Sequence, residues 1–162
     1  INPPDMLMIA ESATLEIEIL PADARQSVTW QTSNSRIASV SSAGVVTGKS
    51  PGTAKITVTA KDGSGAKATF KVTVYRPVKK VTLSKTSGTR TVGKTVQLSA
   101  TVSPRNATYK KILWSSSDPT VATVSASGLV TAVGAGEAIV TAKAKYGAND
   151  GVLAIYRLTV TP

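Results

Sequence analysis

Two glutamates, Glu16 and Glu18, come closest to a catalytic pair in this chain of 162 residues. On a β-strand they would share one face about 7 Å apart, a separation that overlaps that of the paired carboxylates of glycosidases. Nothing in the surrounding sequence supplies a cleft that would make one of them a general acid. We therefore interpret the pair as part of a solvated outer face and predict no catalytic residue.

Composition restricts other chemistry. The chain contains neither histidine nor cysteine, which excludes Ser-His and Cys-His nucleophiles and thiolate metal sites within it. A calcium site needs about six oxygen ligands, and the acids Asp62, Asp118, Glu137 and Asp150 stand far apart in the sequence. A loop site built partly from carbonyl oxygens stays open as an alternative. We predict no metal, no cofactor and no enzymatic activity.

The net charge of +10 is uneven along the chain. Residues 1–76 carry 8 Lys/Arg against 6 Asp/Glu (+2), whereas residues 77–162 carry 11 against 3 (+8). Such a field attracts anionic partners, although a merely solvated surface is the simpler alternative. The sequence shows no recognition helix or exposed aromatic residues beside the charge, which disfavours nucleic acid as a partner. The candidate anion-binding surface consists of Lys79, Lys80, Lys110, Lys111, Lys143 and Lys145.

These residues are positioned by a repeated unit. Residues Val28–Lys61 recur without a gap as Ile112–Lys145, and 13 of the 34 aligned pairs are identical. Unrelated sequences would match at only about 2 or 3 positions, so the chain is two copies of one unit. We place the domains at residues 1–76 and 77–162. The short junction between them contains Pro77 and no Gly/Ser-rich stretch, which predicts units held end to end.

Period-two alternation predicts strands in both units. Residues 53–60 place Ala54, Ile56 and Val58 on one face and Thr and Lys on the other, and residues 137–144 keep the same phase. A further strand is expected over residues 15–19. Ser-Ala-Gly at 42–44 and Ala-Ser-Gly at 126–128 predict tight hairpins. About seven short strands per unit indicate an all-β, two-sheet antiparallel sandwich.

Each unit contains one tryptophan on an early strand, Trp30 or Trp114. Both share an inward phase with their apolar neighbours. We therefore interpret the two rings as the centres of the two cores and not as ligand-stacking surfaces.

The recurring motifs resemble those of the group 2 bacterial immunoglobulin-like domain. They read W-Q-T-S-N, I-A-S-V-S, G-V-V-T-G, G-T-A and V-T-V in the first copy, and W-S-S-S-D, V-A-T-V-S, G-L-V-T-A, G-E-A and L-T-V in the second. The resemblance implies two tandem Ig-like β-sandwiches of an intimin- or invasin-type surface protein. It implies no binding residue, because the matching positions are core and turn positions.

The resemblance implies a non-enzymatic, extracellular or cell-surface module that acts as a semi-rigid spacer or adhesion stalk. Two alternatives stay open: an accessory module of an exported carbohydrate-active enzyme that binds glycan or wall polymer, and a phage virion decoration domain. The expected partners are an anionic glycan, a cell-wall polymer or a host surface protein. No apolar run predicts membrane insertion. The ends of the sequence read as those of a monomeric fragment of a larger protein.

Overall fold

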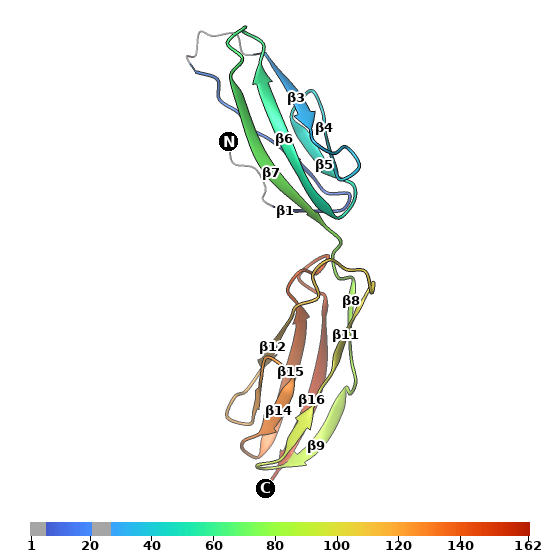
Figure 1. Ribbon diagram of the computed structural model, residues 1–162. Helices are drawn as coiled ribbons and strands as arrows, with labels where there is room; N and C mark the ends of the chain where they lie inside the picture. The colour runs from blue at the N-terminus through green and yellow to red at the C-terminus, as the bar shows by residue number, and fades with distance from the viewer. Residues whose placement is uncertain (1–5, 21–26) are drawn as a thin grey trace. The chain divides into compact units, whose positions relative to one another are not determined.

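The computed structural model describes residues 6–20 and 27–162 as strands joined by turns. Within these ranges no helix is long and apolar enough to span a membrane. The chain divides into two compact units, unit 1 (Ile1–Arg76) and unit 2 (Pro77–Pro162). Each unit layers small sheets face to face around an apolar core (Figure 1). The predicted all-β class is confirmed.

Unit 2 packs one four-stranded sheet against two smaller ones. Its strands are β8 (Lys80–Leu83), β9 (Ser87–Thr91), β10 (Thr95–Gln97), β11 (Ala100–Ser103), β12 (Ile112–Ser116), β13 (Ala122–Val124), β14 (Leu129–Ala132), β15 (Gly136–Ala144) and β16 (Leu153–Thr161). The large sheet has the order β12-β15-β16-β9, and the smaller ones are β10-β14-β13 and β11-β8. All pairs are antiparallel except β9 with β16, which run parallel over five residue pairs.

Unit 1 repeats this plan with fewer strands. They are β1 (Met6–Met8), β2 (Ser12–Thr14), β3 (Val28–Thr32), β4 (Ala38–Val40), β5 (Val45–Gly48), β6 (Gly52–Ala60) and β7 (Lys67–Tyr75). The sheets are β1-β7-β6-β3 and β2-β5-β4, with β1 parallel to β7 over three pairs. Strand β1 is the counterpart of β9. Within the described residues, unit 1 has no strand that corresponds to β8 or β11.

The predicted pleat of the long strands is confirmed. Strand β6 buries Ala54, Ile56 and Val58, while Thr53 and Lys55 are exposed. Strand β15 buries every second residue from Ala138 to Ala144. This alternation arises because successive side chains of a strand point to opposite faces, so the β-branched and alanine positions of the sequence form one continuous apolar layer.

The two tryptophans pack against the cores but are only half-buried. Each lies on an edge strand and covers the glycine of the predicted hairpin, Gly44 or Gly128, whose φ angles are +77° and +82°. A Cβ atom on these glycines would lie 2.9 Å and 2.7 Å from Cζ2 of the ring. Left-handed backbone and ring contact therefore both require glycine. The central residue of unit 2 is instead Tyr156, its largest fully buried side chain.

The repeated Asn or Asp after each tryptophan strand closes a turn. In unit 1, the Oδ1 atom of Asn34 accepts a hydrogen bond from the backbone N–H of Arg36 at 3.0 Å. In unit 2, the Oδ1 atom of Asp118 accepts one from the N–H of Thr120 at 2.9 Å and one from its hydroxyl at 2.6 Å. The short polar side chain thus replaces backbone partners in the turn, which explains why only Asn and Asp stand at this position of the repeat.

The strand expected over residues 15–19 is wrong. Strand β2 ends at Thr14, and residues 15–19 carry no strand pairing although Leu15 is buried and Glu16 and Glu18 are exposed. In unit 2 the corresponding stretch changes sheets: β10 pairs with β14, and β11 pairs with β8. The alternation predicts which side chains face the core, but pairing also requires a neighbouring strand.

Candidate functional site

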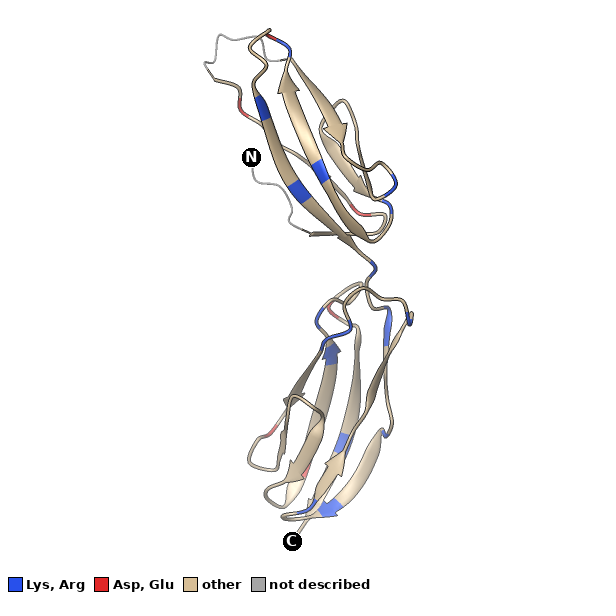
Figure 2. Cartoon of the chain, viewed as in Figure 1, with Lys and Arg blue, Asp and Glu red and all other residues tan. Residues whose placement is uncertain are grey.

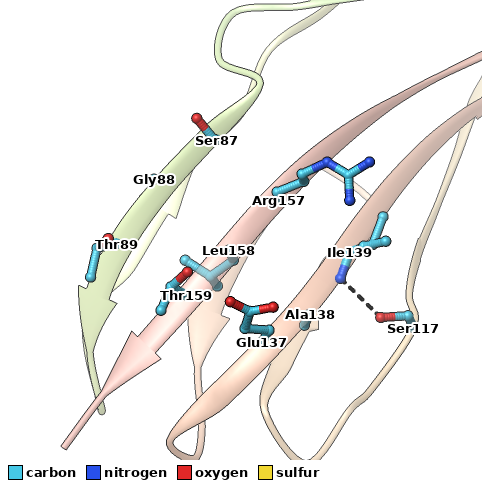
Figure 3. A pocket seen from close by; sticks show the side chains of 10 residues that line it. All are labelled: Ser87, Gly88, Thr89, Ser117, Glu137, Ala138, Ile139, Arg157, Leu158 and Thr159. Atoms are coloured by element: carbon cyan, nitrogen blue, oxygen red, sulfur yellow. Dashed lines mark hydrogen bonds between the residues drawn. The ribbon is translucent and has the colours of Figure 1, made fainter.

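A shallow depression of about 520 Å³ lies on the outer face of the large sheet of unit 2 (Figure 3). Glu137 and Arg157 are the charged side chains that line it, on the adjacent strands β15 and β16. Its rim includes Ser117, whose hydroxyl oxygen accepts a hydrogen bond from the N–H of Ile139 at 2.9 Å. One carboxylate beside one guanidinium lacks the paired carboxylates of acid–base hydrolysis. This depression therefore does not present a recognisable catalytic arrangement.

The carboxylates singled out from the sequence are also scattered. Glu16 and Glu18 are exposed in the stretch that follows β2. Asp62 and Asp118 lie in turns in different units, where they accept hydrogen bonds from Ser64 and Thr120. No group of three or more acidic side chains close enough to hold a metal ion occurs among the residues that the structure describes.

Three of the six candidate lysines lie in or next to the paired strands β12 and β15 at one edge of unit 2. The backbone N–H of Lys145 donates to the carbonyl of Lys111 at 2.9 Å, and Lys143 stands opposite Leu113 in the pairing of β15 with β12. Lys143 forms an exposed ion pair with Asp150, at 3.1 Å between Nζ and Oδ1. The carboxylate of Asp150 offsets the charge of Lys143, so Lys111 and Lys145 carry most of the positive charge of this edge.

The other three candidate lysines lie around β8 and β11. Lys80 is paired with Ser103, and the N–H of Lys79 donates to the carbonyl of the same serine at 2.7 Å. Lys110 shares a shallow surface groove with β11 and Arg105. The lysines and arginines of unit 2 are spread over several strands and loops (Figure 2). Lys79, Lys80 and Lys110 adjoin β8 and β11 together with Arg105, whereas Lys111, Lys143 and Lys145 adjoin β12 and β15.

An aromatic pair of half-buried tyrosines lies beside the basic residues. The rings of Tyr109 and Tyr146 lie 4.9 Å apart between centroids and are tilted by 41°. The Nζ atom of Lys145 lies 5.4 Å from the centre of the Tyr146 ring, within the range of a cation–π interaction. The signal in the sequence is that each tyrosine adjoins a candidate lysine, in Tyr109-Lys110 and Lys145-Tyr146.

A family model for the bacterial Ig-like domain (group 2) matches residues 5–71 and again residues 77–154. The chain belongs to this family. Both group 2 Ig-like units are therefore recognised by the same model, and the resemblance of their motifs is confirmed. The second match begins at Pro77, ahead of β8, whereas the first begins at Asp5, just ahead of β1. Only the second match therefore includes a β8-type strand.

Relatives of the tandem units occur in several protein classes. The chain is 33% identical over 146 residues to an uncharacterized protein of Clostridium acetobutylicum, which covers 90% of this chain and 15% of that protein. It is 34% identical over 149 residues to the Ig-like virion protein of Serratia phage KSP90, covering 89% and 58% respectively. It thus spans less than two thirds of either relative. A stretch of 66 residues is 48% identical to an alpha-L-arabinofuranosidase of Bifidobacterium longum, covering 41% of this chain and 6% of the enzyme.

The fold is shared with more distant proteins. The crystal structure of murine CEACAM1b matches with a TM-score of 0.52 at 14% identity and covers 98% of this chain and 96% of that one. At this identity the likeness concerns the fold alone.

Proposed function

We propose that the two Ig-like units serve as a spacer or stalk module on a secreted or surface-exposed protein and perform no catalysis. The observation that carries this proposal is where the chain enters and leaves unit 2. Val78 enters beside the turn before β16, where its carbonyl accepts a hydrogen bond from the N–H of Ala148 at 2.8 Å. The nine residues of β16 then run from that turn to Thr161 (Figure 1). The two ends of unit 2 are therefore separated by about 30 Å of strand.

The parallel strand pairs suit such a module. In unit 2 the early strand β9 is parallel to the last strand β16, and in unit 1 β1 is parallel to β7. Tension applied to the two ends of a unit would load the hydrogen bonds of this parallel pair together, in shear, and not one after another. Each unit is thus suited to resist extension.

The relatives support a module with no catalytic role of its own. A virion protein contains a similar pair of units, and the match to the arabinofuranosidase is confined to 6% of that enzyme. Such distribution among otherwise different proteins fits a transferable structural unit. From it we infer an extracellular or surface location for the protein that carries the pair.

The spacer proposal predicts a fixed separation between the ends of unit 2. Because the chain has no cysteine, spin labels at Lys79→Cys and Pro162→Cys give one defined pair for pulsed electron paramagnetic resonance. We expect one narrow distance distribution, set by about 30 Å of strand plus the two labels. The same labelled chain in guanidinium chloride is the control. A native distribution as broad as that of the unfolded control would contradict the proposal.

A second candidate function, weak binding of an anionic glycan or wall polymer, is favoured by the aromatic pair beside the basic edge. Tyrosine rings offer a flat apolar surface with a polar tip, and Lys111 and Lys145 supply charge next to them. We expect Lys111→Glu with Lys145→Glu to weaken heparin binding more than the matched exposed pair Lys85→Glu with Lys94→Glu. Equal weakening by both pairs, or binding abolished by moderate salt whatever the polymer, would show only a general charge effect.

A further inference from the structure

An apolar groove of about 440 Å³ opens in unit 1 between residues 17–20 and the ends of β6 and β7 that meet at their connecting turn. Its apolar lining includes Ile17, Leu20, Val58, Ala60 and Ala68, and charged residues line it as well, namely Glu18, Asp62 and Lys67. Leu20 is 73% exposed, the largest value among the exposed large hydrophobic residues that the structure describes. A single exposed leucine is ordinary, but a continuous apolar groove indicates a surface that another segment covers.

The repeat identifies the segment that covers the equivalent place in unit 2. The N–H of Leu15 donates to the carbonyl of Gly44 at 3.0 Å, and the N–H of Leu98 donates to that of Gly128 at 2.9 Å. These matching bonds place residues 17–20 in correspondence with β11. In unit 2 the strand beside β11 is β8, which packs on β15 and β16.

Strand β8 closes this side of the unit 2 sandwich with two aliphatic side chains. Val81 is 5% exposed and Leu83 is 8% exposed, and both belong to the core cluster. Beside them Val152 and Tyr156 are buried, at 7% and 0% exposure. The equivalent residues of unit 1 are more exposed to solvent.

No strand in the described part of unit 1 covers the equivalent residues. Ala66, the counterpart of Val152, is exposed, and Phe70, the counterpart of Tyr156, is only half-buried. Among the residues that the structure describes, Val58 is buried but lies outside the core cluster of unit 1, which contains 8 buried residues against 18 in unit 2. The open groove is thus the place where a first strand would complete the sandwich.

We propose that this groove is the seat of an extended strand of the β8 type, carried in cis directly ahead of Ile1. The parallel pairs fix its register, because Leu7 stands opposite Val74 as Arg90 stands opposite Val160. The positions that correspond to Lys80–Leu83 therefore immediately precede Ile1. The strand presents two branched aliphatic residues to the groove and polar residues to solvent, and it adds main-chain pairing to apolar burial.

The test adds the strand. The sequence of Val78–Leu83 is fused directly ahead of Ile1 in the full chain, with Trp114→Phe so that Trp30 fluorescence reports on unit 1. The control fusion carries Val81→Lys and Leu83→Lys in the copied segment alone. We expect the first fusion to raise the thermal midpoint of unit 1 by about 5 °C or more. The control should leave it unchanged, because lysine does not fill an apolar groove. No shift, or an equal shift with both fusions, overturns the proposal.

A reciprocal variant and a sedimentation experiment complete the test. Val81→Lys with Leu83→Lys in β8 itself should lower the midpoint of unit 2, followed by Trp114 in a Trp30→Phe background. The chain without the fusion should sediment as a monomer at micromolar concentration. A dimer that persists in the fused chain would assign the groove to a second copy and overturn the cis assignment.

Discussion

Units 1 and 2 carry the same tryptophan, glycine and turn positions, yet the described residues close the sandwich on both sides in unit 2 alone. At the tryptophan end the two units make the same contacts, because Gly44 and Gly128 lie under equivalent rings. At the other end β8 covers unit 2, and the described part of unit 1 has no such strand. The recurring residues therefore specify the sheet layers and the hairpin, whereas β8 adds Val81 and Leu83 to the core of unit 2.

The largest difference between the units is expected from equivalent core leucines. Leu98 is 0% exposed and Leu15 is 4% exposed, and both occupy the same position of the repeat. We expect Leu98→Ala to lower the free energy of unfolding by about 4 kcal/mol and Leu15→Ala by about 2 to 3 kcal/mol. The loss at Leu15 is smaller because the side chains of the smaller unit 1 core can move further into the cavity that alanine leaves. Urea denaturation, followed by the fluorescence of the tryptophan in each unit, measures both free energies of unfolding. An equal or larger loss of stability in Leu15→Ala would contradict the expected difference.

The hairpin glycines should show where the units agree. We expect Gly44→Ala and Gly128→Ala each to cost about 2 to 3 kcal/mol, since both force alanine into left-handed backbone and push Cβ into a tryptophan ring. Gly63 and Gly93 are matched controls, because their φ angles are +90° and +81° but no atom lies within 4 Å of an added Cβ.

At the control positions Gly→Ala should cost only about 1 kcal/mol. Equal losses at hairpin and control positions in thermal unfolding would show that ring contact contributes nothing.

Tyr156 and Phe70 are equivalent residues that differ by one hydroxyl group. The hydroxyl of Tyr156 is buried, and no hydrogen-bond partner for it occurs within the described residues. Since a buried polar group without a partner is unfavourable, we expect Tyr156→Phe to stabilise unit 2 by about 1 kcal/mol. Phe70→Tyr should have less effect, because the half-buried ring of Phe70 can expose the hydroxyl to water. A loss of stability on Tyr156→Phe in calorimetry would contradict this account.

The smallest effect concerns the turn carboxylate of unit 2. Hydrogen bonds from the side chain and the N–H of Thr120 hold the pKa of Asp118 below its ordinary value of 3.8. A lowered pKa in the folded state adds stability above pH 3.8, and this stability is lost as the pH falls through the folded-state pKa. Asn34 occupies the position in unit 1 and does not titrate.

Asp118→Asn should therefore make the unfolding midpoint of unit 2 less dependent on pH below 3.8. Thermal unfolding of unit 2 between pH 5 and pH 2 measures the change. An unaltered pH profile in the variant would show that Asp118 does not contribute to the acid dependence of unit 2 stability.

The sequence predicts which faces of the long strands are buried better than it predicts which strands pair at the sheet edges. Alternation in β6 and β15 identifies their buried faces, because every second side chain of a paired strand faces the core. The same alternation fails as a strand prediction over residues 15–19, since pairing depends on a neighbour that local pattern does not contain. The parallel pairs of β1 with β7 and of β9 with β16 likewise join strands that are far apart in the sequence, so the local pattern does not predict them.

The candidate site was predictable only in part. The lysines of unit 2 are visible in the charge balance, but their division between two sheets depends on which strands become neighbours. Tyr109 and Tyr146 are far apart in the sequence and meet only because their loops lie at the same end of unit 2. The sequence predicts the tryptophans as the centres of the cores, whereas both rings pack against the cores half-buried, because each lies on an edge strand.

Single-molecule extension of the full chain, held by its two ends, tests most directly whether the two units bear load independently. Two independent load-bearing units predict two unfolding events, each releasing roughly 200 to 270 Å of chain. Unit 1 should yield at the lower force, because its parallel pair has three residue pairs against five in unit 2. Leu15→Ala should lower only the first event and Leu98→Ala only the second. A single event, or extension without a force peak, would contradict the account.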